Sequence, residues 1–209
     1  MYCPTLFREE RIEVLHGLMK AYPLATLITS GPNGLEANLI PFSLHEGGEK
    51  GVLRAHLARA NSQLEALRGG ADTLVVFQGP ESYVTPSWYP SKAEHGKVVP
   101  TWNFVMVQAR GSLRVIDDPD WILAQVKQLT LNQEGGRAQP WKVEDAPANF
   151  VAGQLKAIVG IELSIESLVG KWKVSQNRSP VDRQGVMEGL RAEGQCPAML
   201  AEMEQNPGR

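Results

Sequence analysis

Residues 24–58, LATLITSGPNGLEANLIPFSLHEGGEKGVLRAHLA, decide the class of fold. Three segments of this stretch have the period of a β-strand. Glycine-rich turns join the segments, GPNG at 31–34 and a second turn at 46–51, and such turns are too short for a parallel crossover. We therefore predict a three-stranded antiparallel meander, with strands at 24–30, 36–44 and 52–58.

Helices and a further strand are predicted on either side of the meander. A helix is predicted over about 7–21, where apolar residues recur at helical spacing. A second, short helix has Asn61 as its N-cap and ends at Gly69-Gly70. The β-branched segment 72–79 follows it and predicts another strand.

The segment 80–100 contains four prolines and predicts a long ordered loop, and loops of that length usually carry function. After it, 98–116 predicts the longest strand, with Gly111 as a bulge or bend. The remaining predicted elements are a helix opened by Asp118-Pro119, a helix over about 147–155, one bent strand or two strands over 158–175, a helix opened by a capping box at 179–182 and ended by Gly194, and an amphipathic segment at 197–205.

These elements favour a mainly β fold with flanking helices over a doubly wound parallel sheet. A small barrel with helices over its ends accommodates the short connections best. No repeat or linker divides the 209 residues. We therefore expect a single domain, 1–209, with a C-terminal helical extension from about 179 to 209.

The composition excludes several classes of protein. With 43% hydrophobic and 21% charged residues the chain can bury a core. Its formal net charge of −2 excludes a polybasic body that binds nucleic acid by bulk charge. No segment has the ~20 apolar residues of a membrane-spanning helix, and charges occupy the place of a signal peptide. The two cysteines, Cys3 and Cys196, exclude a disulfide framework and favour a reducing cytoplasm.

Common catalytic motifs are absent from the sequence. The dinucleotide fingerprint, the P-loop and the hydrolase elbow all lack a match. The four histidines, His16, His45, His56 and His95, are scattered without ligand spacing. We therefore predict neither a metal site nor a catalytic residue.

The segment 54–63 combines a strand with the start of a helix. Unpaired amides at a helix N-terminus suit a phosphate, and Arg59 could add a bidentate contact. His56 lies three residues earlier on the strand. The alternative is that Asn61 only caps the helix, that Arg59 is solvated and that His56 is half-buried.

Two further groups of residues have chemistry suited to a ligand. Aromatic residues at 86–90 and 99–104 could wall a planar ligand, although they could equally be core or loop anchors. The segment 170–178, GKWKVSQNR, carries three cations and could face a phosphate or a nucleic-acid backbone. Its alternative is a solvated strand end.

Five motifs occur in order along the chain: HLARAN (56–61), FQGP (77–80), PSWYPSK (86–92), VPTWNF (99–104) and GKWKVSQNR (170–178). The opening Met-Tyr-x-Pro and NLIPF at 38–42 accompany them. Together these motifs resemble those of the PaiB-type FMN-binding negative transcriptional regulators. The resemblance extends from residue 1 to about 185, and 186–209 lies outside it.

The resemblance implies an FMN-binding split β-barrel related to the pyridoxine phosphate oxidase fold, with FMN between the subunits of a homodimer. It implies that 56–63 hold the phosphate and that 38–42 lie along the ring system. A second phosphate site, which the oxidase reaction itself would need, has no evident cationic cluster. The implied cofactor-binding residues are Asn38, Leu39, Ile40, Pro41, His56, Leu57, Arg59, Asn61, Gln63, Trp102, Asn103, Lys173, Gln176 and Arg178.

The family's role implies repression of transcription in a bacterial cytoplasm. The local basic cluster that could contact DNA comprises Lys171, Lys173, Arg178 and Arg183. If FMN phosphate occupies it, regulation would act through a protein partner. A flavin reductase or oxidase acting on a small molecule is the alternative function, since flavin itself carries the redox chemistry. His56 and Tyr89 would be its candidates for proton transfer, and a flavin-free dimeric scaffold is a third interpretation.

Overall fold

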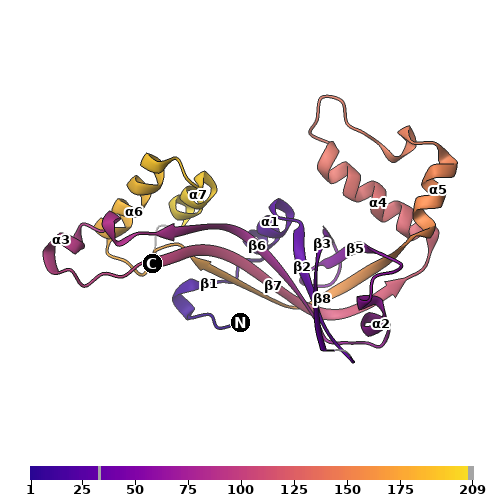
Figure 1. Ribbon diagram of the computed structural model, residues 1–209, viewed down its shortest axis with the longest axis horizontal. Helices are drawn as coiled ribbons and strands as arrows, with labels where there is room; N and C mark the ends of the chain where they lie inside the picture. Colours follow the sequence, from indigo (N-terminus) through magenta and orange to yellow (C-terminus); the bar gives the residue numbers. More distant parts are fainter. Residues whose placement is uncertain (33, 207–209) are drawn as a thin grey trace. The chain divides into compact units, whose positions relative to one another are not determined.

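A computed structural model describes residues 1–32 and 34–206, which form mainly β-strands with flanking helices (Figure 1). The sheet order is β3-β2-β6-β7-β8-β5-β4, with β1 paired to β8. The strands are β1 (Arg8–Glu9), β2 (Leu24–Gly31), β3 (Gly34–Pro41), β4 (Ser43–His45), β5 (Val52–Ala58), β6 (Thr73–Val84), β7 (Thr101–Ile116) and β8 (Ile158–Lys173). The helices are α1 (Ile12–Ala21), α2 (Gln63–Arg68), α3 (Ser91–His95), α4 (Pro119–Glu134), α5 (Ala148–Lys156), α6 (Pro180–Glu193) and α7 (Pro197–Gln205), with short 3-10 turns at Thr5–Phe7, Pro86–Trp88 and Val143–Asp145.

The described chain divides into two compact units, each built from separate segments. Unit 1 comprises Met1–Leu18, Gln78–Val107 and Val169–Arg209, of which 207–209 lie outside the described residues. Unit 2 comprises Met19–Phe77 and Gln108–Leu168. The single domain expected from the sequence stays a prediction. Within the described ranges, no helix has both the length and the apolar character that crossing a membrane requires.

In unit 2 the predicted meander is instead two separate hairpins. β2 pairs with β3 and β4 pairs with β5, but the ladder partner of β5 on its other side is β8. The predicted strand 36–44 breaks because Pro41 has no N–H to continue the ladder, and the next amide, of Phe42, donates to the carbonyl of Pro23 at 2.9 Å. Asn33, in the predicted turn, lies outside the described residues.

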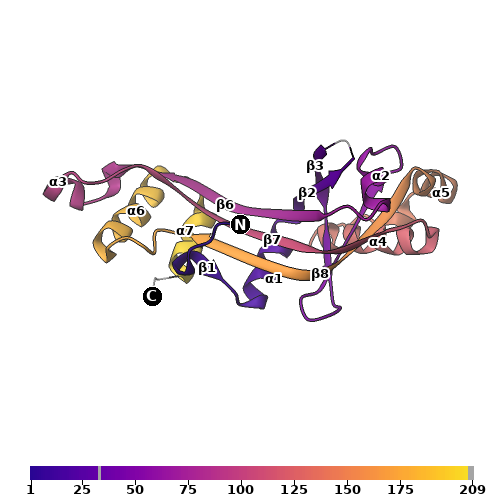
Figure 2. The same cartoon turned by 90° about the horizontal axis from the view of Figure 1, so that it is seen from below.

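Helices α2, α4 and α5 belong to unit 2. Figure 2 shows α2 beside the β2–β3 hairpin, and Figure 1 shows α4 and α5 side by side. The predicted Asp118 cap is confirmed, since its carboxylate accepts the amides of Asp120 at 2.9 Å and Trp121 at 3.3 Å. The helix predicted over about 147–155 is confirmed as α5.

Gly111 on β7 lies directly against the backbone of β8. β7 continues through it, so the predicted bulge or bend does not end the strand. A Cβ atom at this position would overlap the carbonyl oxygen of Ser164 and lie 3.0 Å from the amide of Glu166. Only glycine therefore allows the two backbones this spacing.

In unit 1 the first predicted helix begins later than its apolar pattern indicated. Residues 8 and 9 form β1, whose partners on β8 are Lys171 and Gly170. The helix begins only at Ile12 because the carboxylate of Glu9 accepts the amides of Glu10 and Arg11, which holds that segment out of a helix. Backbone pairing with β8 thus outweighs local helical spacing.

The predicted loop 80–100 is largely ordered secondary structure. β6 continues to Val84, with Pro80, Ser82 and Val84 buried in alternation. A 3-10 turn at Pro86–Trp88 and the short helix α3 follow. Residues 80–84 show no alternation in hydrophobicity, because Ser82 is buried while Tyr83 is exposed; the strand is evident only from the burial of every second residue.

Helices α6 and α7 form the C-terminal part of unit 1. The predicted cap of α6 is confirmed, because Ser179 Oγ accepts the amide of Asp182 at 3.2 Å, and Gly194 ends the helix with φ +62°. Gly185 and Gly189 form a notch on α6 that contacts Trp88, with no room for a Cβ atom. The amphipathic segment 197–205 is the helix α7, which packs against α6 (Figure 1).

Candidate functional site

The residues predicted to bind the cofactor divide between the two units. Those of unit 2 lie on β3, at the end of β5 and at the start of α2. Those of unit 1 lie at the start of β7 and around the end of β8. The unit 2 set is Asn38, Leu39, Ile40, Pro41, His56, Leu57, Arg59, Asn61 and Gln63; the unit 1 set is Trp102, Asn103, Lys173, Gln176 and Arg178.

Asn38 and Gln63 join β3 to α2 through their side-chain amides. Asn38 Nδ2 donates to Gln63 Oε1 at 3.0 Å. Gln63 has no exposed surface, and its Nε2 donates to the carbonyls of Leu27 and Glu36, both at 3.1 Å. Gln63 is therefore a fixed part of the interior, while Asn38 is half-buried at its edge.

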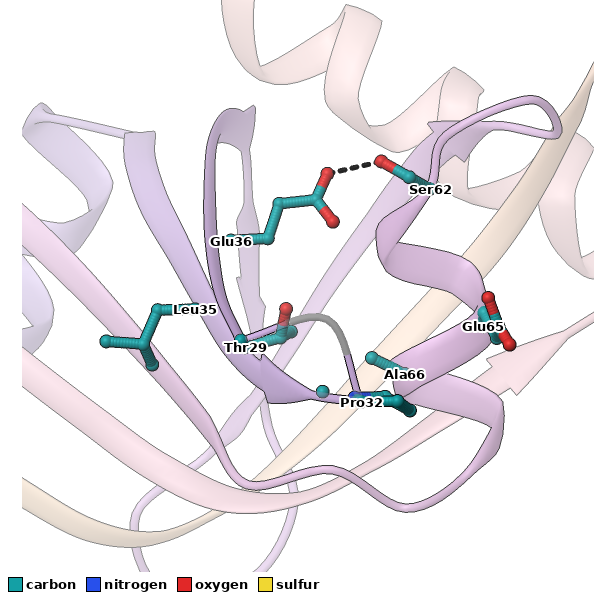
Figure 3. Close-up of a pocket in the computed structure, with 9 residues that line it drawn as sticks. Thr29, Pro32, Leu35, Glu36, Ser62, Glu65 and Ala66 are labelled. Carbon is teal, nitrogen blue, oxygen red and sulfur yellow. Dashed lines mark hydrogen bonds between the residues drawn. The ribbon is translucent and has the colours of Figure 1, made fainter.

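A small cavity of about 200 Å³ lies beside this amide pair. In Figure 3 the carboxylate of Glu36 points toward the hydroxyl of Ser62, which donates to it. Glu65 also lines the cavity. Two carboxylates in so small a space repel an anion, so this cavity is unsuited to a phosphate group.

The strand-to-helix segment 56–63 is largely engaged by other parts of unit 2. His56 Nδ1 lies 2.8 Å from Gln125 Oε1 on α4, and Leu57 is buried. The N-cap position of α2 is Ser62, one residue later than predicted, although Asn61 Oδ1 still accepts the amide of Gln63 at 2.9 Å.

The guanidinium of Arg59 already has protein partners. Its Nη1 lies 2.5 Å from Asp117 Oδ1, and its Nε and Nη2 donate to the carbonyls of Lys156 and Ile158, both at 3.1 Å. The hydrogen bond from Arg59 lowers the pKa of Asp117. A phosphate that bound Arg59 would therefore have to compete with Asp117.

Unit 1 gathers positive charge at the end of β8. Burial, together with the nearby charges of Arg178 and Lys171, lowers the pKa of Lys173. Lys173 Nζ donates to Thr101 Oγ1 at 2.7 Å, and the guanidinium of Arg178 lies over the ring of Tyr89, 4.6 Å from its centre. Among the described residues, none of these three cations forms an ion pair with a carboxylate. A phosphate dianion would relieve their mutual repulsion.

The other predicted residues of unit 1 have different environments. Trp102 is half exposed, and its ring meets that of Tyr83 edge-on at 5.6 Å. Asn103 is fully buried, and its Nδ2 donates to Ser175 Oγ at 2.9 Å. Gln176 is bonded to neighbouring backbone groups, accepting the amide of Val174 at 2.7 Å. Trp102 is thus the one of the three whose side chain is open to a ligand.

An exposed apolar face on the β2–β3 hairpin was missed by the sequence reasoning. Leu35, Ala37 and Leu39 alternate along β3 and are all exposed, with Leu39 at 64%. In register beside them on β2 are Ile28, opposite Ala37, and Thr26, opposite Leu39. We name these five residues the hairpin face. The alternation within 35–39 was the signal that could have revealed it, because every second residue shares one face.

A larger groove of about 540 Å³ in unit 2 is lined by none of the predicted cofactor residues. His45 lines this groove, and its Nε2 lies 2.8 Å from the hydroxyl of Ser43. Burial is the main cause that lowers the pKa of His45, and the charge of Arg54 adds to it.

In the part of the chain that is described, no three His, Cys, Asp or Glu side chains lie close enough together to hold a metal ion.

Comparison with known proteins identifies the family. The model of the family described as "Putative FMN-binding domain" matches residues 1–167. This chain belongs to that family. FMN is accordingly its cofactor, and the resemblance to PaiB-type proteins is confirmed.

Relatives of the family occur in fungi and in a bacterium. An uncharacterized protein of Emericella nidulans is 34% identical over 226 residues, covering 91% of this chain and 90% of its own length. The "Protease synthase and sporulation protein PAI 2" of Bacillus subtilis is 27% identical over 194 residues, covering 92% and 90%. A bacterial source for this chain stays a prediction.

Solved structures show the fold of the family. An FAD and heme binding protein of Mycobacterium smegmatis matches with a TM-score of 0.59 and 21% identity over 79% of this chain and 73% of its own. A flavocytochrome of Azotobacter vinelandii matches with a TM-score of 0.57 and 18% identity over 80% and 69%. The predicted split β-barrel is confirmed.

The residues present fit FMN by their chemistry. The unpaired cations of unit 1 suit its phosphate, and the exposed Trp102 offers an apolar face to a planar ring. The half-buried amide of Asn38 offers polar atoms to a ring edge. Taken separately, unit 1 therefore offers groups that match the phosphate and the ring, and unit 2 offers an amide that matches a polar ring edge.

Proposed function

We propose that this chain is an FMN-binding homodimer that represses transcription, with the flavin held between its subunits. The observation that carries the proposal is the match to the Bacillus subtilis sporulation protein, which covers nine-tenths of both chains. Flavin would give such a regulator a group that responds to the redox state of the cell.

The hairpin face supports the homodimer. β3 lies at an end of the sheet order, and three of its side chains expose apolar surface on one side. Exposed apolar faces of this kind mark interaction sites, and an unpaired edge strand is a liability unless it is covered. A second copy of the chain would bury the face, and a twofold axis would pair it with itself.

The cofactor residues divide by role in this proposal. In unit 1, Lys173 and Arg178 neutralise a phosphate and Trp102 walls a ring; in unit 2, residues 38–41 offer polar atoms to a ring edge. His56, Arg59 and Asn61 are the alternative set of phosphate contacts, although His56 and Arg59 are already bonded to Gln125 and Asp117. The buried Leu57, Gln63 and Asn103, and the internally bonded Gln176, hold these groups in place. FMN, when bound, supplies one- and two-electron redox chemistry.

Replacing Arg178 with Ala is expected to weaken FMN binding by about 1.5–3 kcal/mol, the range of a charged hydrogen bond. Arg59→Ala is the matched control. It should cost less binding free energy, because in the wild-type chain the guanidinium of Arg59 is already paired with Asp117. Fluorescence titration of apoprotein with FMN measures both. A larger loss for Arg59→Ala would assign the phosphate to residues 56–63 instead.

Deletion of the gene should raise a defined set of transcripts, and restoring the wild-type chain should lower them again. The Arg178→Ala chain should fail to do so if FMN is required for repression. Sequencing of RNA from the three strains measures this. An unchanged transcript profile would contradict the regulatory proposal.

Direct contact with DNA would use Lys171, because the guanidinium of Arg183 already donates to the carbonyls of Met203 and Asn206. Binding of promoter fragments should then weaken steeply with salt, with a shallower slope in Lys171→Ala. A flat salt response in a mobility-shift series would favour regulation through a protein partner.

A flavin-dependent oxidoreductase is the second candidate function. Tyr89 favours it, because its buried hydroxyl has no partner among the described residues and burial raises its pKa. A phenol that stays protonated beside Arg178 could donate a proton to a substrate. NAD(P)H oxidation by the FMN-loaded protein, lost in Tyr89→Phe, would support this activity.

A further inference from the structure

The amide of Gln63 can take only one orientation. Its nitrogen faces two backbone carbonyls, those of Leu27 and Glu36, and the hydroxyl of Thr29 at 3.3 Å. Turning the amide over would set its oxygen against both carbonyl oxygens and leave buried groups unpaired, which costs about 1–3 kcal/mol for each such group. Gln63 Oε1 therefore faces away from these three acceptors.

The orientation of Gln63 fixes that of Asn38. Only a donor can sit opposite Gln63 Oε1, and Asn38 supplies it through Nδ2 at 3.0 Å. The same nitrogen lies 3.5 Å from Glu36 Oε1, which also requires a donor. Asn38 Oδ1 is thereby directed away from both, and no donor in residues 1–32 or 34–206 reaches it.

The free oxygen of Asn38 selects the chemistry of its ligand. An amide oxygen only accepts hydrogen bonds, so it cannot pair with a phosphate oxygen, a ring carbonyl or an unprotonated ring nitrogen. The ring system of oxidised flavin has one donor, the imide N3–H. Residues 38–41 are the segment proposed above to offer polar atoms to the edge of that ring.

We propose that Asn38 Oδ1 accepts a hydrogen bond from the imide N3–H of FMN and that Gln63 is the positioning residue that holds Asn38 in this orientation. The inference rests on the proposed placement of 38–41 at the flavin. It changes the role of Gln63, which the sequence resemblance implied to be a direct cofactor contact. An acceptor at this position also favours a flavin whose imide N3 carries a hydrogen over one whose N3 does not.

The first test needs no substitution. FMN and 3-methyl-FMN, in which a methyl group replaces the imide hydrogen, are titrated separately into wild-type apoprotein. We expect 3-methyl-FMN to bind about 3- to 10-fold more weakly, the range of one neutral hydrogen bond. Equal affinities would overturn the proposal while leaving FMN binding and the regulatory function intact.

Substitutions then assign the discrimination to the two amides. Asn38→Leu should lose the preference for FMN over 3-methyl-FMN. Gln63→Met, which fills similar space without the acceptor, should reduce the preference, and the double variant should behave like Asn38→Leu alone. A Gln63→Met protein that loses affinity for both flavins equally, with its preference unchanged, would overturn the positioning role.

Thr29→Val is the matched control for a purely structural effect. It removes one of the three acceptors of Gln63 Nε2 but leaves the two carbonyls that fix the amide. The free energy of unfolding should fall, while the preference for FMN over 3-methyl-FMN should stay as in the wild type. Loss of that preference in Thr29→Val would contradict the argument from the backbone carbonyls.

Discussion

Replacing Leu39 with Asp is expected to convert the homodimer into monomers and to release most of the bound FMN. Leu39 is 64% exposed in the single chain and is one of the two leucines of the hairpin face. In a dimer the new carboxylate would be buried without a partner, and twofold symmetry would place two of them in one interface. An unpaired buried charge costs about 3–5 kcal/mol, so the dimer should weaken at least about 100-fold.

Leu131→Asp is the matched control for this prediction. Leu131 is exposed to a similar degree, 61%, but lies on α4, outside the hairpin face. Sedimentation velocity measures the oligomeric state, and the flavin absorbance that remains after desalting measures retention. A Leu39→Asp protein that stays dimeric would contradict the assignment of the face, and a monomer that retains FMN would contradict a cofactor held between subunits.

Replacing Gly111 with Ala is expected to lower the free energy of unfolding by about 3 kcal/mol or more. The added methyl group would overlap the backbone of β8 at Ser164, and no side-chain rotation can relieve a clash with backbone. Strain of this kind in a packed interior costs about 1–3 kcal/mol even when neighbours can shift. Urea denaturation with linear extrapolation measures the change.

Gly153→Ala is the control that separates this clash from a general effect of alanine. Gly153 lies inside α5, where nothing approaches within 4 Å of an added Cβ atom. Alanine favours a helix over glycine by roughly 1 kcal/mol, so this substitution should stabilise the protein. A Gly111→Ala chain as stable as the wild type would mean that β7 and β8 can separate at little cost.

Features decided by adjacent residues could be predicted from the sequence. Asp118 caps α4 through amides two and three residues away, and Ser179 caps α6 in the same way. The break at Phe42 could not be predicted, because its amide is bonded to Pro23, nineteen positions earlier along the chain. The partner of β5 is likewise found on β8, far beyond any local pattern.

The same distinction applies to the candidate site. The motifs led to Arg59 and His56 by local chemistry, but their actual partners are Asp117 and Gln125, on other elements of unit 2. The orientation of Asn38 depends on Gln63, 25 positions away. Motif resemblance can name residues near a cofactor, but long-range hydrogen bonds decide which atoms they present.

The pairing of β5 with β8 has a consequence for synthesis on the ribosome. Residues 52–58 meet partners at 158–164, about 100 positions later, so at roughly 5–20 residues per second the nascent chain waits on the order of 5–20 s for its partner strand. During that interval β5 has an open edge, and the apolar hairpin of β2 and β3 has already emerged. Slower translation would lengthen this interval. Chaperones that shield exposed strands should therefore improve the yield of this protein.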